Sequence, residues 1–139
     1  MRLLASKQDE TRAWPGGFGH AKVGANYGPS FVAHGEAQQR GYDQILWLLG
    51  PDCLVTEAGA SNFFVVMRNK ETGEEELITA PLEDKVILPG VTRRSVIELV
   101  RERLGNVKVV ERTFGMGELV SAWEDGRIVE AFVSGTAVS

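Results

Sequence analysis

The chain has 139 residues, with 15 Lys and Arg, 19 Asp and Glu, and a formal net charge of −4. This length predicts a single domain. An acidic balance with scattered basic residues gives no reason to expect a nucleic-acid partner. Cys53 is the only cysteine, so an internal disulfide is excluded, which suits a reducing compartment. No apolar run is long enough to span a membrane, so no membrane partner is predicted.

The first third of the chain alternates between glycine-rich and periodic segments. Residues 12–28 contain many glycines and predict strand and loop rather than a regular helix. Pro29 is favourable at the beginning of a helix. Residues 30–40 predict that helix, and Gly41 is expected to end it. The apolar run at residues 44–49 predicts a buried strand.

The middle of the chain predicts a series of hairpins. Residues 54–56 and 62–67 are apolar and predict two strands joined through a turn at Gly59. Residues 68–74 are polar and predict a hairpin loop. Residues 76–80 predict the strand that returns from it.

The last third predicts two helices and two strands. Residues 90–104 carry apolar side chains close to helical spacing and predict a helix. Residues 107–110 predict a strand, residues 116–123 a short helix and residues 128–133 a last strand. A mixture of mostly hairpin-joined strands with a few helices predicts a single α+β domain, or a barrel-like α/β arrangement.

Lys22 is the first candidate for chemistry, because small and apolar residues surround it and Tyr27 follows closely. Poor solvation disfavours the ammonium and lowers the pKa of a lysine. The pattern therefore predicts a nucleophilic amine that can bond to an aldehyde cofactor. A solvent-exposed lysine in a glycine-rich loop is the alternative, since lysines are mostly exposed.

Two further positions suit cofactor binding. Glu57 follows an apolar strand, where it can face a cofactor or lie in water as exposed glutamates usually do. Gly90, Val91 and Thr92 open the helix predicted at residues 90–104, and free N–H groups at a helix start favour a phosphate. Ordinary capping by a small polar residue explains the same pattern.

Metal binding is not predicted. His20 and His34 are the only histidines, and His34 has no acidic or cysteine partner at metal-ligand spacing.

Four segments, in order, resemble the branched-chain amino acid aminotransferases, the fold type IV enzymes that use pyridoxal 5′-phosphate (PLP). They are Trp-Pro-Gly-Gly-Phe-Gly-His-Ala-Lys-Val-Gly-Ala-Asn-Tyr-Gly-Pro at residues 14–29, Val-Thr-Glu-Ala-Gly-Ala-Ser-Asn-Phe-Phe at 55–64, Leu-Pro-Gly-Val-Thr-Arg at 88–93 and Ser-Gly-Thr-Ala at 134–137. The resemblance implies that residues 12–139 form the large cofactor-binding domain of fold type IV, incomplete here, with residues 1–11 as an N-terminal remnant.

The resemblance also implies a role for individual residues. Lys22 would hold PLP and transfer protons, Tyr27 would donate a hydrogen bond to the cofactor O3′, and Glu57 would face the pyridine nitrogen. The phosphate is assigned to Val91, Thr92 and Thr136, and the substrate carboxylate to the backbone amides of Thr136 and Ala137. A packing tyrosine is the alternative for Tyr27, and a frayed C-terminus is the alternative for Thr136.

The implied reaction moves the amino group of Leu, Ile or Val to 2-oxoglutarate in an intracellular homodimer, cytoplasmic or mitochondrial. Its small-molecule partners are an amino acid and a 2-oxo acid. D-amino acid aminotransferase and aminodeoxychorismate lyase share the fold and the lysine, so they stay alternatives. Members of the family are longer and begin with a smaller domain, which we expect to be absent here. A catalytically silent binding module is therefore a further alternative.

Overall fold

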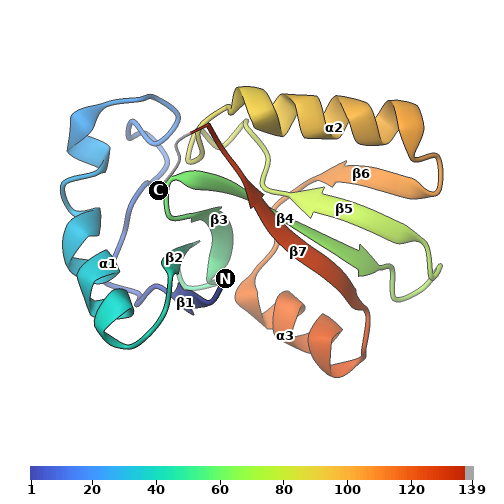
Figure 1. Cartoon of the computed structure of the whole chain (residues 1–139), viewed down its shortest axis with the longest axis horizontal. Coiled ribbons are helices and arrows are strands. Elements are labelled where there is room, and N and C mark those ends of the chain that lie inside the picture. The colour runs from blue at the N-terminus through green and yellow to red at the C-terminus, as the bar shows by residue number, and fades with distance from the viewer. Residues whose placement is uncertain (137–139) are drawn as a thin grey trace.

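The chain folds into a mixed α+β structure, as the sequence predicts, in a computed structural model that describes residues 1–136 (Figure 1). Every predicted helix and strand outside residues 12–28 lies within two residues of its expected bounds. The strands are β1 (Leu3–Ala5), β2 (Gln44–Leu49), β3 (Leu54–Ala58), β4 (Ser61–Arg68), β5 (Glu75–Thr79), β6 (Val107–Glu111) and β7 (Ile128–Ser134). The helices are α1 (Ser30–Gln39), α2 (Val91–Arg103) and α3 (Met116–Glu124).

The glycine-rich segment at residues 12–28 forms turns and a short 3₁₀ helix at Gly24–Asn26, and the strand predicted there is wrong. Turn contacts replace sheet pairing: the Ala21 N–H donates to the Phe18 carbonyl at 2.9 Å. The Asn26 side-chain amide donates to the same carbonyl and to that of Ala21. These local bonds satisfy backbone groups that a strand would have paired with a neighbour.

Strand β1 was not predicted. It pairs in parallel with β2, and Leu4 lies opposite Ile45. Three residues carry too little periodicity to indicate a strand, so this pairing is visible only in the folded chain.

Strand β4 lies at the centre of the sheet and pairs with β3, β5 and β7 (Figure 1). All three pairings are antiparallel, whereas β5 and β6 pair in parallel. The turn between β3 and β4 includes Gly59, whose φ of 57° favours glycine. The resulting register places Glu57 directly opposite Asn62, which becomes important at the candidate site.

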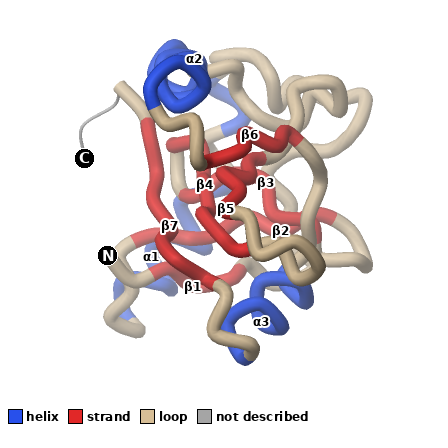
Figure 2. Tube along the Cα trace, turned by 90° about the vertical axis from the view of Figure 1, so that its right-hand side faces the viewer, coloured by secondary structure: helices blue, strands red, loops and turns tan. Residues whose placement is uncertain are grey.

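Three clusters of apolar side chains attach the helices to the strands. Figure 2 shows the strands between α2 and α3. Helix α1 packs Ala33 and Ala37 with Ile45 and Trp47. Helix α3 buries Leu119 and Ala122 in the largest cluster, formed mainly by β3, β4 and β5. Helix α2 buries Ile97 against Phe64 and Leu77. The position of α2 therefore depends on the centre of the sheet.

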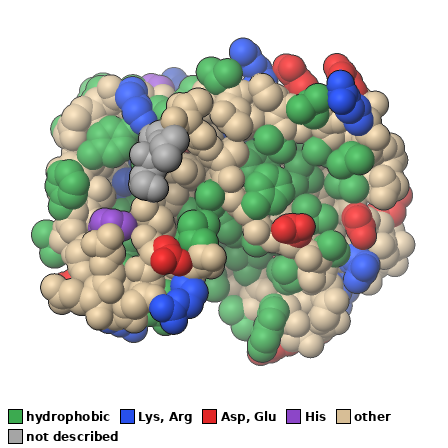
Figure 3. Space-filling model, in the orientation of Figure 1, with side chains coloured by type: hydrophobic (Ala, Val, Ile, Leu, Met, Phe, Trp, Pro, Cys, Tyr) green, Lys and Arg blue, Asp and Glu red, His purple; other side chains and the backbone are tan. Residues whose placement is uncertain are grey.

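The surface carries both charged and large apolar side chains, and hydrophobic side chains gather near the middle of the face in Figure 3. Phe31 and Trp123 are 72% and 73% exposed. Among the helices of residues 1–136, none combines the length and the apolar character that a membrane crossing requires.

Replacing Phe64 by Ala is expected to lower the free energy of unfolding by about 3–5 kcal/mol, because the side chain is fully buried and its truncation leaves a cavity. The Phe64 ring also stacks on Phe132 with centroids 4.9 Å apart. Denaturant unfolding measures the change. Phe31→Ala is the matched control, because an exposed ring should contribute within about 0.5 kcal/mol. Equal decreases in the free energy of unfolding for the two variants would contradict the burial of Phe64 in the core.

Candidate functional site

A cavity of about 290 Å³ opens where the start of α2, the β3–β4 hairpin and the end of β7 approach the segment that carries Lys22. Five of the residues predicted from the sequence line it together. Its lining comprises Lys22, Glu57, Ala60, Asn62, Leu88, Pro89, Gly90, Val91, Thr92, Ser134, Gly135 and Thr136. Segments far apart in the sequence thus contribute an amine, a carboxylate and a helix start to one space.

Lys22 lies at the rim of this cavity and is exposed to solvent. The expectation of a poorly solvated lysine was therefore wrong, because the small residues around it form turns on the surface instead of packing over it. Its Nζ lies 5.1 Å from the centroid of the Tyr27 ring, within the range of a cation–π contact. Tyr27 itself lines a neighbouring cavity, which shares Ala60 with the first.

Glu57 is the buried acid of the site and is 4% exposed. One carboxylate oxygen accepts the Leu88 N–H at 2.6 Å and the Asn62 side-chain amide at 3.5 Å. The other oxygen lies 3.4 Å from Nη2 of Arg12. Burial raises the pKa of Glu57 above its ordinary value, and the Arg12 guanidinium is the strongest of the effects that oppose this rise. The prediction of a functional acid at this position is thus compatible with its burial.

The start of α2 forms the opposite wall of the cavity. Gly90 precedes the helix in an extended conformation, and no side chain caps it. The first backbone bond of the helix runs from the Arg94 N–H to the Gly90 carbonyl, so the N–H groups of residues 91–93 have no partner within the helix. Such groups, with the helix dipole, favour an anion, and the half-buried Thr92 adds a hydroxyl.

Asn62 connects the acid to the helix start. Its amide donates to the Leu88 carbonyl at 2.9 Å as well as approaching Glu57. Its Oδ1 lies so close to Gly90 that a Cβ added there would be 2.3 Å away. Glycine at position 90 is therefore required by this close approach rather than by its backbone angles.

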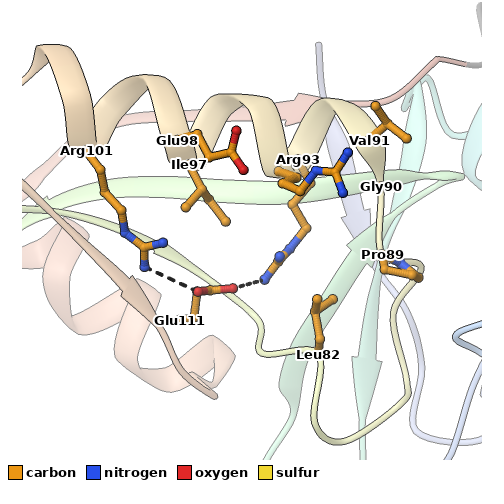
Figure 4. Close-up of a pocket in the computed structure, with 10 residues that line it drawn as sticks. Leu82, Pro89, Gly90, Val91, Arg93, Ile97, Glu98, Arg101 and Glu111 are labelled. Atoms are coloured by element: carbon orange, nitrogen blue, oxygen red, sulfur yellow. Dashed lines mark hydrogen bonds and ion pairs between the residues drawn. The ribbon is translucent and has the colours of Figure 1, made fainter.

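Arg93 anchors the first turn of α2, and its side chain points toward Glu111, as Figure 4 shows. It is 3% exposed, and its Nη2 donates to the Ala80 carbonyl at 2.9 Å and to Glu111 at 2.7 Å. Arg101, on the same helix, reaches the other oxygen of Glu111 at 3.4 Å. The helix start is thereby tied to the ends of β5 and β6, and a second cavity of about 300 Å³ lies alongside these groups.

The segment after β7 brings Thr136 to the cavity, where it is exposed. The predicted substrate contact at Ala137 lies outside the described residues.

Arg12, Asn62 and Arg93 were not predicted as site residues. Pairing the predicted strands across the turn at Gly59 identifies Asn62 as the neighbour of Glu57. Arg93 ends one of the segments that carry the resemblance and Arg12 lies just before another, but their partners lie far away in the sequence. No local pattern indicates such pairs.

The arrangement suits a small molecule that has an electrophilic carbon, a basic ring atom and an anionic group. Lys22 supplies an amine for the first, Glu57 a carboxylate for the second, and the start of α2 an anion site for the third. PLP has these three groups, an aldehyde, a pyridine nitrogen and a phosphate, so the residues present fit the cofactor that the resemblance implies.

Relatives of known family match most of this chain. The chain is 49% identical over 136 residues to the mitochondrial branched-chain-amino-acid aminotransferase of Schizosaccharomyces pombe, covering 96% of this chain and 31% of that protein. It is 49% identical over 129 residues to the cytosolic enzyme of Saccharomyces cerevisiae, covering 91% and 34%. The chain thus spans about a third of the length of these relatives.

Structure comparison confirms the predicted fold. The chain superposes on the branched-chain amino acid aminotransferase of Thermobaculum terrenum, solved in its PLP form, with a TM-score of 0.76 and 32% identity, covering 97% of this chain and 39% of that one. Residues 3–139 match the family described as Amino-transferase class IV. The chain therefore belongs to the class IV aminotransferase family.

Proposed function

We propose that this chain is the PLP-binding part of an aminotransferase that acts on branched-chain amino acids. The observation that carries this proposal is the single cavity lined by Lys22, Glu57 and Thr92. The cofactor present in the Thermobaculum terrenum structure and the names of the relatives support the cofactor and the substrate class. In this proposal residues 12–139 are the portion of the large domain that holds the cofactor.

Each residue of the cavity has a distinct task in this function. PLP, when bound, supplies an electron sink for the α-carbon of an amino acid. Lys22 holds the aldehyde carbon and then carries a proton to and from the substrate α-carbon. Glu57 holds a proton at the pyridine nitrogen. The N–H groups of Val91 and Thr92, with Thr136, bind the phosphate.

Tyr27 lies beside Lys22, with its ring against the amine. We infer that its hydroxyl serves the cofactor O3′. The partners inferred for the whole protein are Leu, Ile or Val, 2-oxoglutarate and a second copy of the chain. A mitochondrial or cytosolic compartment is inferred from the two yeast relatives.

Borohydride reduction in the presence of PLP is expected to leave a pyridoxyl group on Lys22, because reduction makes the bond between amine and aldehyde permanent. Peptide mapping by mass spectrometry identifies the labelled residue. Lys108→Arg is the matched control, since Lys108 is an exposed lysine on β6 that does not line the cavity. It should leave the label unchanged, whereas Lys22→Arg should remove it.

Label spread evenly over the exposed lysines would contradict the proposed cofactor site. A separate sample with PLP but without borohydride is given leucine and 2-oxoglutarate to test transamination, measured as glutamate formed. A chain that takes the label on Lys22 but forms no glutamate is the silent binding module considered from the sequence.

Gly90→Ala is expected to weaken PLP binding at least about tenfold, or about 1.4 kcal/mol. The new Cβ meets Oδ1 of Asn62 and displaces the start of α2 from the anion site. Absorbance titration measures the affinity. Gly117→Ala, in open space on α3, is the control and should bind PLP as the wild type does. Equal affinity for PLP in the two variants would contradict the proposal that the start of α2 binds the phosphate.

A further inference from the structure

Arg12 forms a buried ion pair with Glu57, which lines the cavity. The two side chains are 6% and 5% exposed, and Nη2 of Arg12 lies 3.4 Å from one carboxylate oxygen. The other oxygen is held by the uncharged N–H groups of Leu88 and Asn62. One carboxylate oxygen therefore accepts hydrogen bonds from uncharged N–H groups, and the other faces the positive charge of Arg12.

The backbone next to Arg12 is tightly packed. Ala13 is buried in a cluster with Ala80, Val86 and Ile87. A Cβ added at Gly19 would lie 2.4 Å from the Ala13 Cβ and 3.0 Å from the Val86 carbonyl. The same carbonyl accepts a hydrogen bond from Nη2 of Arg12. The segment thus holds the arginine at a fixed place beside the acid.

Within residues 1–136, Nε of Arg12 is buried and has no hydrogen-bond partner. Leaving such a group unpaired costs free energy. The polar contacts that the Arg12 guanidinium does make are those of its Nη2, to Glu57 and to the Val86 carbonyl.

Two cations and two N–H groups face the Glu57 carboxyl. Burial raises its pKa, and Arg12, the Leu88 N–H and Lys22 oppose the rise in that order; the Asn62 amide is the second N–H group. Lys22 is exposed, so solvent and salt screen its charge. Arg12 is buried, so solvent screens its charge on Glu57 far less.

We propose that Arg12 is a positioning residue that makes Glu57 a weaker base, so that a proton shared between Glu57 and the pyridine nitrogen of the cofactor stays on the nitrogen. This inference rests on the function proposed above. Without Arg12 the buried carboxyl keeps the proton, the ring nitrogen becomes neutral, and the ring withdraws electrons less strongly from the reacting carbon.

The first test needs no cofactor. The Glu57 carboxyl is titrated by ¹³C NMR in the cofactor-free wild type and in Arg12→Met and Arg12→Lys. Arg12→Met should raise the proton affinity of Glu57 about tenfold or more, and Arg12→Lys should restore most of the wild-type value. Arg112→Met is the matched control, because Arg112 pairs with Glu118 away from the cavity. An unchanged Glu57 titration in Arg12→Met overturns the proposal.

The second test uses PLP labelled with ¹⁵N in the ring. The chemical shift of the nitrogen should indicate a protonated pyridine in the wild type and a neutral one in Arg12→Met. A structural role of Arg12 alone would weaken binding without changing this protonation state, and that result overturns the proposal. If PLP does not attach to the wild type at all, the proposed function is wrong, while the cofactor-free titration still decides whether Arg12 controls Glu57.

The wild type alone provides a test that does not depend on a variant folding. The guanidinium N–H resonances of Arg12 should move with the same midpoint as the Glu57 carboxyl, because protonation of Glu57 breaks the ion pair. Guanidinium resonances that stay constant through the titration of Glu57 overturn the proposal.

Discussion

Burial of one carboxylate, that of Glu57, organises the site. A charged group removed from water must be paired and hydrogen-bonded, and loss of one partner of a buried pair typically costs about 3–5 kcal/mol. The partners here come from three separate segments: Arg12 from the glycine-rich turns, Asn62 from β4, and the Leu88 N–H from the loop before α2. The hydrogen bonds and the ion pair of this one carboxylate thus connect the segments that surround the cavity.

The start of α2 is likewise held by polar contacts of buried side chains, on two sides. On the cavity side Asn62 approaches Gly90 and binds the Leu88 carbonyl. On the far side the buried Arg93 reaches Ala80 and Glu111. The apolar contacts of Ile97 with Phe64 then fix the rest of the helix on the sheet. An anion site made of backbone N–H groups needs this rigidity, because its donors cannot adjust independently of the helix.

The amine of Lys22 differs from both groups. The acid is buried and the helix start is held by Asn62 and Arg93, whereas the lysine lies on a surface turn at the rim. In the function proposed above, an exposed amine beside a buried acid suits a group that must form a bond, release it and carry a proton. The division of the site into a fixed part and an exposed part follows from which segments pack against the sheet.

Local sequence patterns predict the helices and most strands correctly, and they propose Lys22, Glu57 and Thr92 for the candidate site. Helical spacing at residues 91–103, the turn at Gly59 and the apolar runs are local patterns, and local physics is sufficient to interpret them. The tertiary structure decided the exposure of Lys22, the pairing of β1 with β2 and the ion pairs of Arg12 and Arg93. These features join residues far apart in the chain, and burial and charge pairing depend on neighbours that no local pattern specifies.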